Sequence, residues 1–188
     1  MRGPVLACTK CPHLVKSRTQ VVFGVGNPDA ELMFVGEAPG EDEDKQGEPF
    51  VGASGQLLDS MLRAVGLSRH ANPEDDPARQ VFIANVLKCR PPVNRNPRPE
   101  EVVQCAPFLK RQVALVQPRL ILAMGRFAVQ ALLDTDTAIG KLRGQVHRYE
   151  GVPVVVTYHP AYLLRNLPDK AKAWADLCLA LDQVESVG

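Results

Sequence analysis

The chain has 188 residues, which is enough for one domain whose hydrophobic core needs no disulfides to support it. Hydrophobic residues make up 45% of the sequence, an ordinary fraction for a globular protein, and no run approaches the roughly eighteen apolar residues of a membrane span. The formal net charge of +1 argues against a protein that binds nucleic acid indiscriminately through bulk charge.

The N-terminal segment contains Cys8 and Cys11 and no apolar stretch followed by a cleavage site. We therefore expect a cytoplasmic protein without membrane attachment, in a compartment where thiols stay reduced. An odd number of cysteines, five, cannot pair completely within one chain, so metal ligands or core residues are a better interpretation than disulfides.

Four short apolar runs along the chain predict buried strands. These runs are Leu32 to Val35, Val81 to Ala84, Leu120 to Met124, and Val154 to Thr157. Helical patterns lie between and after them, at Gln56 to Val65, Glu100 to Val116, Arg126 to Leu133, and Asp169 to Val184.

This alternation of strands and helices predicts an α/β fold. We expect a single three-layer domain over residues 1–188, with a mainly parallel four-stranded central sheet flanked by helices. The polar run from Ser68 to Arg79 predicts an insertion loop rather than a further element.

Four cysteines form a C-x-x-C pair, Cys8 and Cys11, and two distant single residues, Cys89 and Cys105. The alternative to metal binding is that these cysteines are buried free thiols, but such thiols are unusual for a C-x-x-C pair at a polar terminus. Four thiolates suit either a tetrahedral zinc ion or a four-iron cluster. The wide separation of the second pair favours iron–sulfur, because zinc ribbons usually carry two close pairs. Cys178 is interpreted as a core residue of the last helix.

Polar side chains follow three of the predicted strands, where a parallel sheet binds its ligands. Glu37 follows the first strand, Asn85 ends the second, and His159 follows the fourth. Taken one at a time, Glu37 is explained as a helix cap, Asn85 as a turn residue and His159 as a structural histidine. Jointly, an acid, an amide and an imidazole at converging strand ends indicate a small-molecule pocket.

Three motifs give the chain a specific resemblance. The stretches GEAPGEDEDKQGEPFVGASGQLLD (36–59), NVLKCRPP (85–92) and HPAYLLR (159–165), with the order of the four cysteines, resemble the family four uracil-DNA glycosylases. The resemblance implies a monofunctional hydrolase of base excision repair, which flips uracil out of DNA, cleaves its N-glycosidic bond and leaves an abasic site. It also implies a 4Fe-4S cluster, with zinc as the alternative, uracil-containing DNA as the partner, and a monomer.

The resemblance assigns the pocket residues to roles. Phe50 matches the aromatic residue that stacks on the base, and Asn85 matches the amide that reads the uracil edge. His159 matches the histidine that faces the 2-oxo oxygen, where negative charge develops as uracil departs.

The loop after the first strand supplies Gly36, Glu37 and Ala38 to the same substrate site. Glu37, Asn85 and His159 are therefore the expected catalytic residues. Because Ala38 stands where the best-known relatives carry an aspartate, Glu37 is the nearest carboxylate that can position water.

DNA contacts are expected from both the glycine loop and the last motif. Ser54 and Gly55 offer backbone N–H groups at a helix start to a phosphate, and Arg165 is positioned to meet another. Leu163 matches the apolar wedge that enters the vacated base stack, with Leu164 as its rival.

Charge is distributed unevenly along the chain. Residues 1–80 carry 8 basic and 12 acidic side chains, whereas residues 81–188 carry 14 and 9. The basic residues that are candidates for phosphate contact are Arg90, Arg95, Arg98, Lys110, Arg111, Lys141, Arg143, Arg148 and Arg165.

Two other functions compete with simple hydrolysis. One is a relative that bonds covalently to DNA through a histidine in the loop after the cysteine strand, but residues 91–97 contain no histidine. The other is a non-catalytic iron–sulfur nucleic-acid-binding module, which would not need three polar groups at converging strand ends.

Overall fold

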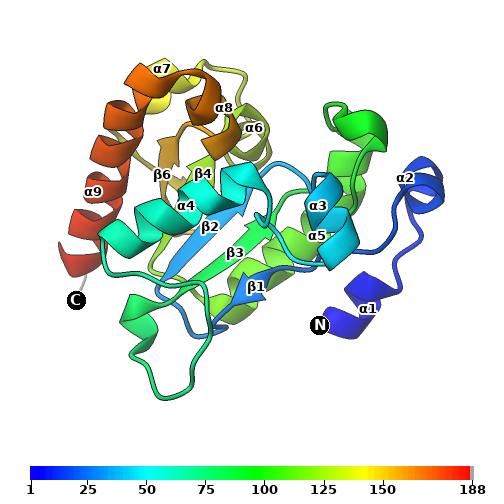
Figure 1. Ribbon diagram of the computed structural model, residues 1–188, viewed down its shortest axis with the longest axis horizontal. Helices are drawn as coiled ribbons and strands as arrows, with labels where there is room; N and C mark the ends of the chain where they lie inside the picture. The colour runs from blue at the N-terminus through cyan, green and yellow to red at the C-terminus, as the bar shows by residue number, and fades with distance from the viewer. Residues whose placement is uncertain (187–188) are drawn as a thin grey trace.

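One mixed β-sheet organises the chain in the computed structural model, which describes residues 1–186 (Figure 1). The strand order is β1-β3-β2-β4-β6-β5. The four inner strands run parallel: β3 (Val81–Asn85), β2 (Leu32–Gly36), β4 (Leu120–Met124) and β6 (Val152–Thr157). The edge strands β1 (Val25–Gly26) and β5 (Val146–Tyr149) run antiparallel to their neighbours.

The expected four-stranded sheet is therefore corrected to six strands, of which the predicted four form the parallel centre. The α/β class is confirmed. The sequence did not reveal the edge strands because β1 has only two residues and β5 contains two half-buried residues among exposed ones. Neither edge strand has the continuous apolar run of a strand buried on both faces.

Nine helices and three 3₁₀ turns connect and cover the strands within residues 1–186. The helices are α1 (Arg2–Leu6), α2 (Pro12–Ser17), α3 (Glu41–Gln46), α4 (Ala53–Ala64), α5 (Pro99–Val116), α6 (Arg126–Leu133), α7 (Ile139–Leu142), α8 (Pro160–Arg165) and α9 (Lys170–Ser186). The 3₁₀ turns are η1 (Pro77–Arg79), η2 (Pro92–Asn94) and η3 (Leu167–Asp169). All four predicted helices form, with ends shifted by three residues or fewer.

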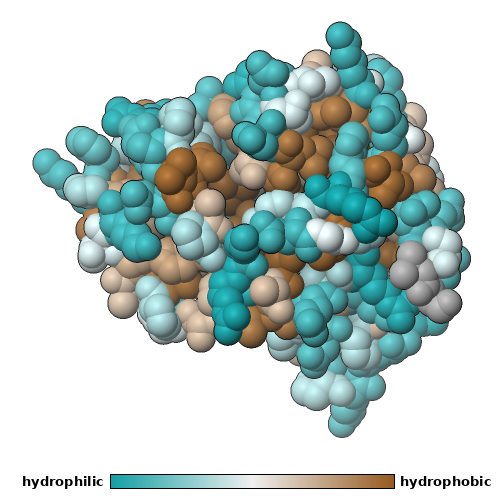
Figure 2. Space-filling model, turned by 180° about the vertical axis from the view of Figure 1, so that it is seen from behind, coloured by the Kyte–Doolittle hydropathy of each residue, from teal (hydrophilic) through white to brown (hydrophobic). Residues whose placement is uncertain are grey.

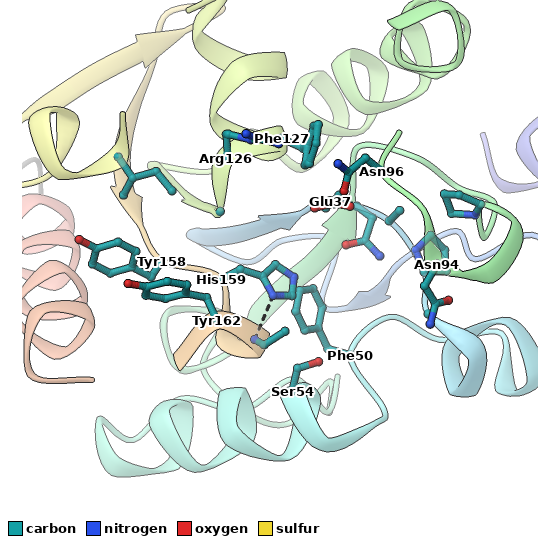
Figure 3. A pocket seen from close by; sticks show the side chains of 18 of the residues that line it. Glu37, Phe50, Ser54, Asn94, Asn96, Arg126, Phe127, Tyr158, His159 and Tyr162 are labelled. Atoms are coloured by element: carbon teal, nitrogen blue, oxygen red, sulfur yellow. Dashed lines mark hydrogen bonds between the residues drawn. The ribbon is translucent and has the colours of Figure 1, made fainter. Parts of the chain in front are cut away.

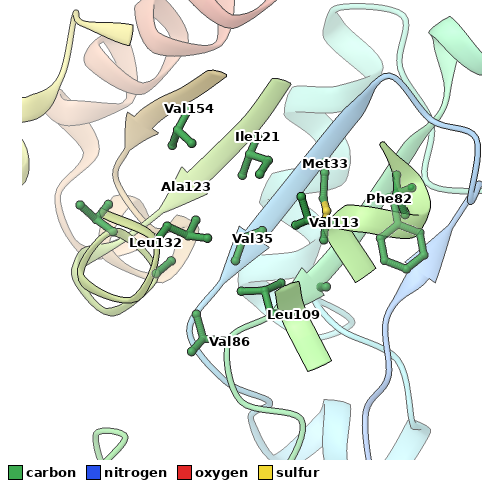
Figure 4. Close-up of a cluster of buried hydrophobic side chains, with 14 of the residues drawn as sticks. Met33, Val35, Phe82, Val86, Leu109, Val113, Ile121, Ala123, Leu132 and Val154 are labelled. Atoms are coloured by element: carbon green, nitrogen blue, oxygen red, sulfur yellow. The ribbon is translucent and has the colours of Figure 1, made fainter. Parts of the chain in front are cut away.

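Helices cover both faces of the sheet, which gives the expected three layers (Figure 1). Successive strand side chains point to opposite faces. Met33 and Val35 of β2 pack with α5 and α6 on one face, where Figure 4 shows Leu109, Val113 and Leu132 closing over the strands. Side chains of alternate parity pack with α4 and α9 on the other face.

The predicted insertion loop, residues 68–79, is anchored more firmly than its polar sequence suggests. Arg69 is buried, with Nε donating to Asp59 Oδ1 at 2.6 Å and a terminal nitrogen donating to the Pro49 carbonyl at 2.7 Å. An isolated bridge joins Ser68 to Gln80 beside the start of β3. The loop is thus fixed at its beginning and its end.

The surface is predominantly polar on the face opposite to that of Figure 1, with hydrophobic side chains in smaller groups between the polar ones (Figure 2). Among residues 1–186, no helix combines the length and apolar character that crossing a bilayer requires.

The central strand β4 should dominate stability. Leu122→Ala removes a side chain that is 1% exposed, and we expect it to lower the free energy of unfolding by about 2–5 kcal/mol. Leu115→Ala in α5, at a side chain that is 50% exposed, is the matched control and should change it far less. Urea denaturation measures both variants, and equal losses would contradict the assigned core.

Candidate active site

A cavity of about 1000 Å³ opens at the carboxyl edge of the parallel strands. The strand register explains why polar side chains gather there. Gly36 at the end of β2 pairs with Asn85 of β3, and Met124 at the end of β4 pairs with Thr157 of β6. The residues that come next in the chain therefore leave the sheet at one edge, as in other open parallel sheets that bind ligands.

Four of the predicted substrate residues, Glu37, Phe50, Asn85 and His159, line this cavity. In Figure 3, Phe50 and His159 lie side by side at its centre, and their ring centroids are 5.4 Å apart with planes inclined by 30°. The sequence-based expectation that these side chains converge thus agrees with the geometry. What each side chain can do chemically depends on its hydrogen bonds and its charge.

Asn85 carries an unsatisfied acceptor into the cavity wall. Its side chain is 3% exposed, and Oδ1 is buried without a hydrogen-bond partner among residues 1–186. A buried polar atom left unpaired costs about 1–3 kcal/mol, so such an atom in a cavity wall points to a ligand N–H that would pair with it.

His159 is held as a neutral hydrogen-bond donor. Its Nδ1 accepts the backbone N–H of Ala161 at 3.0 Å, the bond drawn in Figure 3, which leaves the ring proton on Nε2. Burial lowers the pKa of His159 to about 4, against the opposing charge of Glu43. At neutral pH the ring therefore presents an Nε2–H without a positive charge.

Burial and a nearby cation act in opposite directions on the pKa of Glu37. Burial raises the pKa of its carboxyl, and the charge of Arg126 partly opposes that rise. Arg126 also lines the cavity. A carboxylate with a raised pKa is a better proton acceptor than an ordinary surface glutamate.

Two glycines make room for Phe50. A Cβ on Gly36 would meet the Phe50 ring at 2.5 Å and Asn85 Oδ1 at 2.6 Å, and a Cβ on Gly55 would collide with the Phe50 carbonyl. Phe50 itself adopts a φ of 55°, which is unusual for a residue with a bulky side chain and persists only where the surrounding structure enforces it. Gly36 and Gly55 thus shape the pocket without lining it.

Glu43 is the main site residue that sequence reasoning missed. Its buried side chain accepts the backbone N–H groups of Val51 at 2.9 Å, Gly52 at 3.0 Å and Gly40 at 3.1 Å. The available signal was its place three residues after Gly40, where a glutamate in the first turn of a helix bonds back to the residue preceding the helix. Glu43 therefore joins the two loops that carry Glu37 and Phe50.

The remaining residues predicted to contact substrate or DNA differ in their exposure and in whether they line the cavity. Ala38, Ser54 and Arg165 line the cavity. Leu163, however, is 1% exposed in α8, whereas Leu164 is 42% exposed. The role of Leu163 as the wedge stays a prediction, but a buried side chain would have to leave its packing to enter a base stack, so exposure favours its rival Leu164. Leu164 is the side chain available for that role.

The rest of the cavity wall comes from segments that the motifs did not assign. Asn94 and Asn96 lie on one side of the Phe50–His159 pair and Tyr158 and Tyr162 on the other (Figure 3). The two tyrosine rings stack with centroids 4.9 Å apart. The only signal in the sequence was their position, because Tyr158 directly precedes the 159–165 motif and Tyr162 lies within it.

Several residues of the predicted basic face are held in ion pairs. Arg95 bonds to Glu101 at 2.6 Å, Arg143 to Asp176 at 2.7 Å, and Lys110 to Glu150 at 3.0 Å. Because these charges are paired within the protein, they are less available to phosphates. Arg95 lines the cavity despite its ion pair, together with two exposed cations, Arg165 and the previously unassigned Arg126.

The four predicted ligand cysteines gather at one end of the molecule. Cys89 and Cys105 are buried in a small apolar cluster against which Cys11 packs, and Arg18 connects Cys8 to this cluster by donating to Cys89 Sγ and to the Cys8 carbonyl. No three His, Cys, Asp or Glu side chains within residues 1–186 are close enough to hold a single metal ion.

The chemistry of this donor set suits a metal cluster. Burial raises the pKa of Cys11, Cys89 and Cys105, that of Cys105 to about 11, so these thiols need a positive partner to ionise. Arg18 provides part of that charge, because its guanidinium donates to Cys89 Sγ at 3.0 Å and to the Cys8 carbonyl at 2.8 Å. Of the four thiols, those of Cys89 and Cys105 are buried and those of Cys8 and Cys11 are half-buried.

Known proteins resemble the chain over most of its length. A family model described as the Uracil DNA glycosylase superfamily matches residues 23–178. A Type-4 uracil-DNA glycosylase of Archaeoglobus fulgidus is 49% identical over 168 residues, which cover 85% of this chain and 79% of the relative. A Type-4 uracil-DNA glycosylase of Thermotoga maritima is 47% identical, covering 86% and 80%. A Type-5 uracil-DNA glycosylase of Pyrobaculum aerophilum is 35% identical, covering 85% and 80%.

The neutral state of His159 makes a pH prediction. Its folded pKa of about 4 lies below the ordinary value of about 6.5 that the unfolded chain regains. Stability linked to this ring is therefore complete above pH ~6.5 and is lost as the pH falls toward ~4, because the unfolded chain binds the proton first.

Urea denaturation between those pH values should show a weaker acid destabilisation in His159→Gln than in the parent. NMR titration of the ring, assigned by the signal that His159→Gln loses, should place the midpoint well below pH 6. A midpoint near 6.5 would refute the neutral donor.

Proposed function

The chain belongs to the uracil-DNA glycosylase superfamily and, within it, to the type-4 enzymes, and from this premise we propose that it hydrolyses the N-glycosidic bond of uracil in DNA. The product is an abasic site, which places the protein in base excision repair. The observation that carries the proposal is the buried, unpaired Asn85 Oδ1 in a cavity shared with a neutral His159 and Glu37.

Base recognition rests on Asn85 and Phe50. A uracil that stacks on the Phe50 ring would place its N3–H against Asn85 Oδ1 and its 4-oxo oxygen against the amide N–H₂. Cytosine has an acceptor at N3 and a donor at the 4-position, so it would leave both groups unpaired. Each such mismatch costs about 1–3 kcal/mol, enough to separate the two bases.

Bond cleavage rests on His159 and Glu37. As the bond between N1 and C1′ breaks, uracil takes the electron pair and negative charge grows on its 2-oxo oxygen. The Nε2–H of His159 donates to that oxygen, a bond that strengthens only as the transition state forms. Glu37 positions the water that attacks C1′ and accepts its proton, for which burial has raised the carboxyl pKa.

Contacts with the DNA backbone are proposed for the cavity rim. Arg126 and Arg165 are exposed cations at the cavity, and Ser54 lies in the first turn of α4, whose free N–H groups suit a phosphate. Leu164 fills the space that the flipped nucleotide leaves. We also propose a monomer in the cytoplasm, where the five cysteines, none of which forms a disulfide within residues 1–186, stay reduced.

A 4Fe-4S cluster is proposed for the four cysteines. Cys8, Cys11, Cys89 and Cys105 would hold it, with Arg18 bonded to the Cys89 thiolate. When bound, the cluster supplies covalent cross-links between the N-terminal segment and the region from β3 to α5. The cysteines that would hold it are grouped with the apolar residues Leu14 and Leu87 and do not line the cavity, so its contribution would be structural.

Simple hydrolysis accounts for the cavity better than its competitors. The loop at residues 91–97 presents two asparagines and Arg95 to the cavity and contains no histidine that could bond covalently to the sugar. A non-catalytic binder has no use for an unpaired buried amide and a neutral imidazole at the same cavity.

Substitution of the two key residues separates recognition from catalysis. His159→Ala should slow single-turnover uracil release on the order of a hundredfold while weakening binding much less, because its bond matters mainly in the transition state. Asn85→Asp should impair uracil release and shift residual activity toward cytosine, whose exocyclic amino group is a donor. Asn72→Asp, in the distant 68–79 loop, is the matched amide-to-acid control.

The measurement is free base released from uracil- and cytosine-containing oligonucleotides by excess enzyme. Rates within a few fold of the parent for both His159→Ala and Asn85→Asp would mean that the active site has been assigned to the wrong side chains. No uracil release by the parent protein would contradict the proposed function itself.

The cluster makes a separate prediction. Purified protein should be brown and contain about four irons per chain, as one cubane requires. Cys105→Ser should lose colour, iron and thermal stability, whereas Cys178→Ser, at a half-buried cysteine of α9, should keep all three. Colourless parent protein with one stoichiometric zinc would show that the alternative metal is correct.

A further inference from the structure

Val93 is the most exposed large hydrophobic side chain within residues 1–186, with 90% of its surface accessible. It lies in the segment between β3 and α5, which arches outward at the upper right of Figure 1. Isolated exposed hydrophobic residues are common, so exposure by itself carries no conclusion.

The backbone at Val93 is strained. Its φ of 49° and ψ of 32° lie in the left-handed region, which β-branched side chains adopt only under constraint. Asn94 follows with a φ of 54° in the same region, where asparagine is well tolerated. A glycine or an asparagine at position 93 would fit this backbone better, so folding alone gives no reason for valine there.

The loop holds this strained residue rigidly. Arg90 Nε donates to Asn94 Oδ1 at 2.7 Å, and the Arg95 guanidinium forks onto both oxygens of Glu101 at 2.6 and 2.9 Å. Prolines at 91, 92 and 97 further restrict the segment. Val93 is thus fixed at the loop tip, and ordering it in a complex would cost little entropy.

The loop that carries Val93 contributes to the cavity wall. Asn94 and Asn96, which follow Val93 closely in the chain, line one side of the cavity, and Tyr162 of α8 lines the other (Figure 3). Leu164, the proposed wedge, is on α8 as well. The two segments that line the cavity from its opposite sides therefore each carry an exposed apolar side chain, Val93 on one and Leu164 on the other.

We propose that Val93 is a second wedge, which inserts into the DNA duplex beside the flipped nucleotide from the side opposite to Leu164. This inference rests on the proposed uracil-DNA glycosylase function. Apolar side chains that enter a base step unstack it, and a rigid wedge recovers part of that cost by burying its own apolar surface. The exposed, strained and immobilised valine of this loop has these properties.

Val93→Asn tests the wedge because it removes the apolar side chain and relieves the backbone strain. Single-turnover uracil release from duplex DNA should fall about tenfold, while release from the same oligonucleotide as a single strand should stay within twofold, since no stack has to be opened. The melting temperature should stay equal or rise. Val93→Ile should retain the duplex rate, and Val103→Asn, at another exposed valine in α5, is the matched control.

Fluorescence of 2-aminopurine placed next to the uracil in the duplex reports unstacking directly. The parent and Val93→Ile should raise it on binding, and Val93→Asn should raise it much less. An unchanged ratio of duplex to single-strand rates, or an undiminished fluorescence rise in Val93→Asn, would overturn the wedge and leave the glycosylase function intact. A parent protein that releases uracil from neither substrate would overturn both.

Discussion

The pocket depends on one buried carboxylate. Glu43 accepts three backbone N–H groups from two loops that are far from the sheet's own hydrogen bonds. Gly40 belongs to the loop that follows β2, and Val51 and Gly52 belong to the turn that carries Phe50 into α4. A buried ion without such partners would be costly, whereas three charge-assisted bonds make it a strong clamp. The same clamp explains why α4 begins at Ala53, three residues before its amphipathic pattern indicates.

Burial, more than charge, sets the protonation states of the site. The nearby Glu43 carboxylate favours a charged His159, yet desolvation outweighs it and lowers the pKa of the ring to about 4. For Glu37 the positive charge of Arg126 favours ionisation, yet desolvation again prevails and the pKa rises. One environment therefore yields a neutral donor and a more basic carboxylate, the pair that expulsion of an anionic base requires.

The sequence predicted those features that are encoded locally. Strands buried on both faces appear as continuous apolar runs, so the four parallel strands could be read directly, whereas β1 and β5 lie at the edges and lack that signal. The convergence of Glu37, Asn85 and His159 followed from the rule that parallel strands meet ligands at one edge.

The sequence did not predict which way individual side chains face. Leu163 and Leu164 are adjacent in a short helix, and only the packing of α8 against α4 decides which of them is buried. Arg95 and Arg143 looked like free cations because their partners, Glu101 and Asp176, come together with them only in the fold. The resemblance of motifs supplied roles, but it could not supply these contacts.

Strand β3 connects the two functional regions through very few residues. Asn85 ends the strand at the cavity, and Cys89 follows four positions later in the cysteine cluster. Between them, the fully buried Lys88 donates from Nζ to the Asn85 carbonyl and to Gln112 Oε1, both at 2.6 Å. A metal centre that immobilises Cys89 would thereby also restrain the backbone from which Asn85 reaches the base. In the proposed function, base recognition by Asn85 would therefore depend on the proposed cluster without any electron transfer, because a short, packed and hydrogen-bonded segment joins the two.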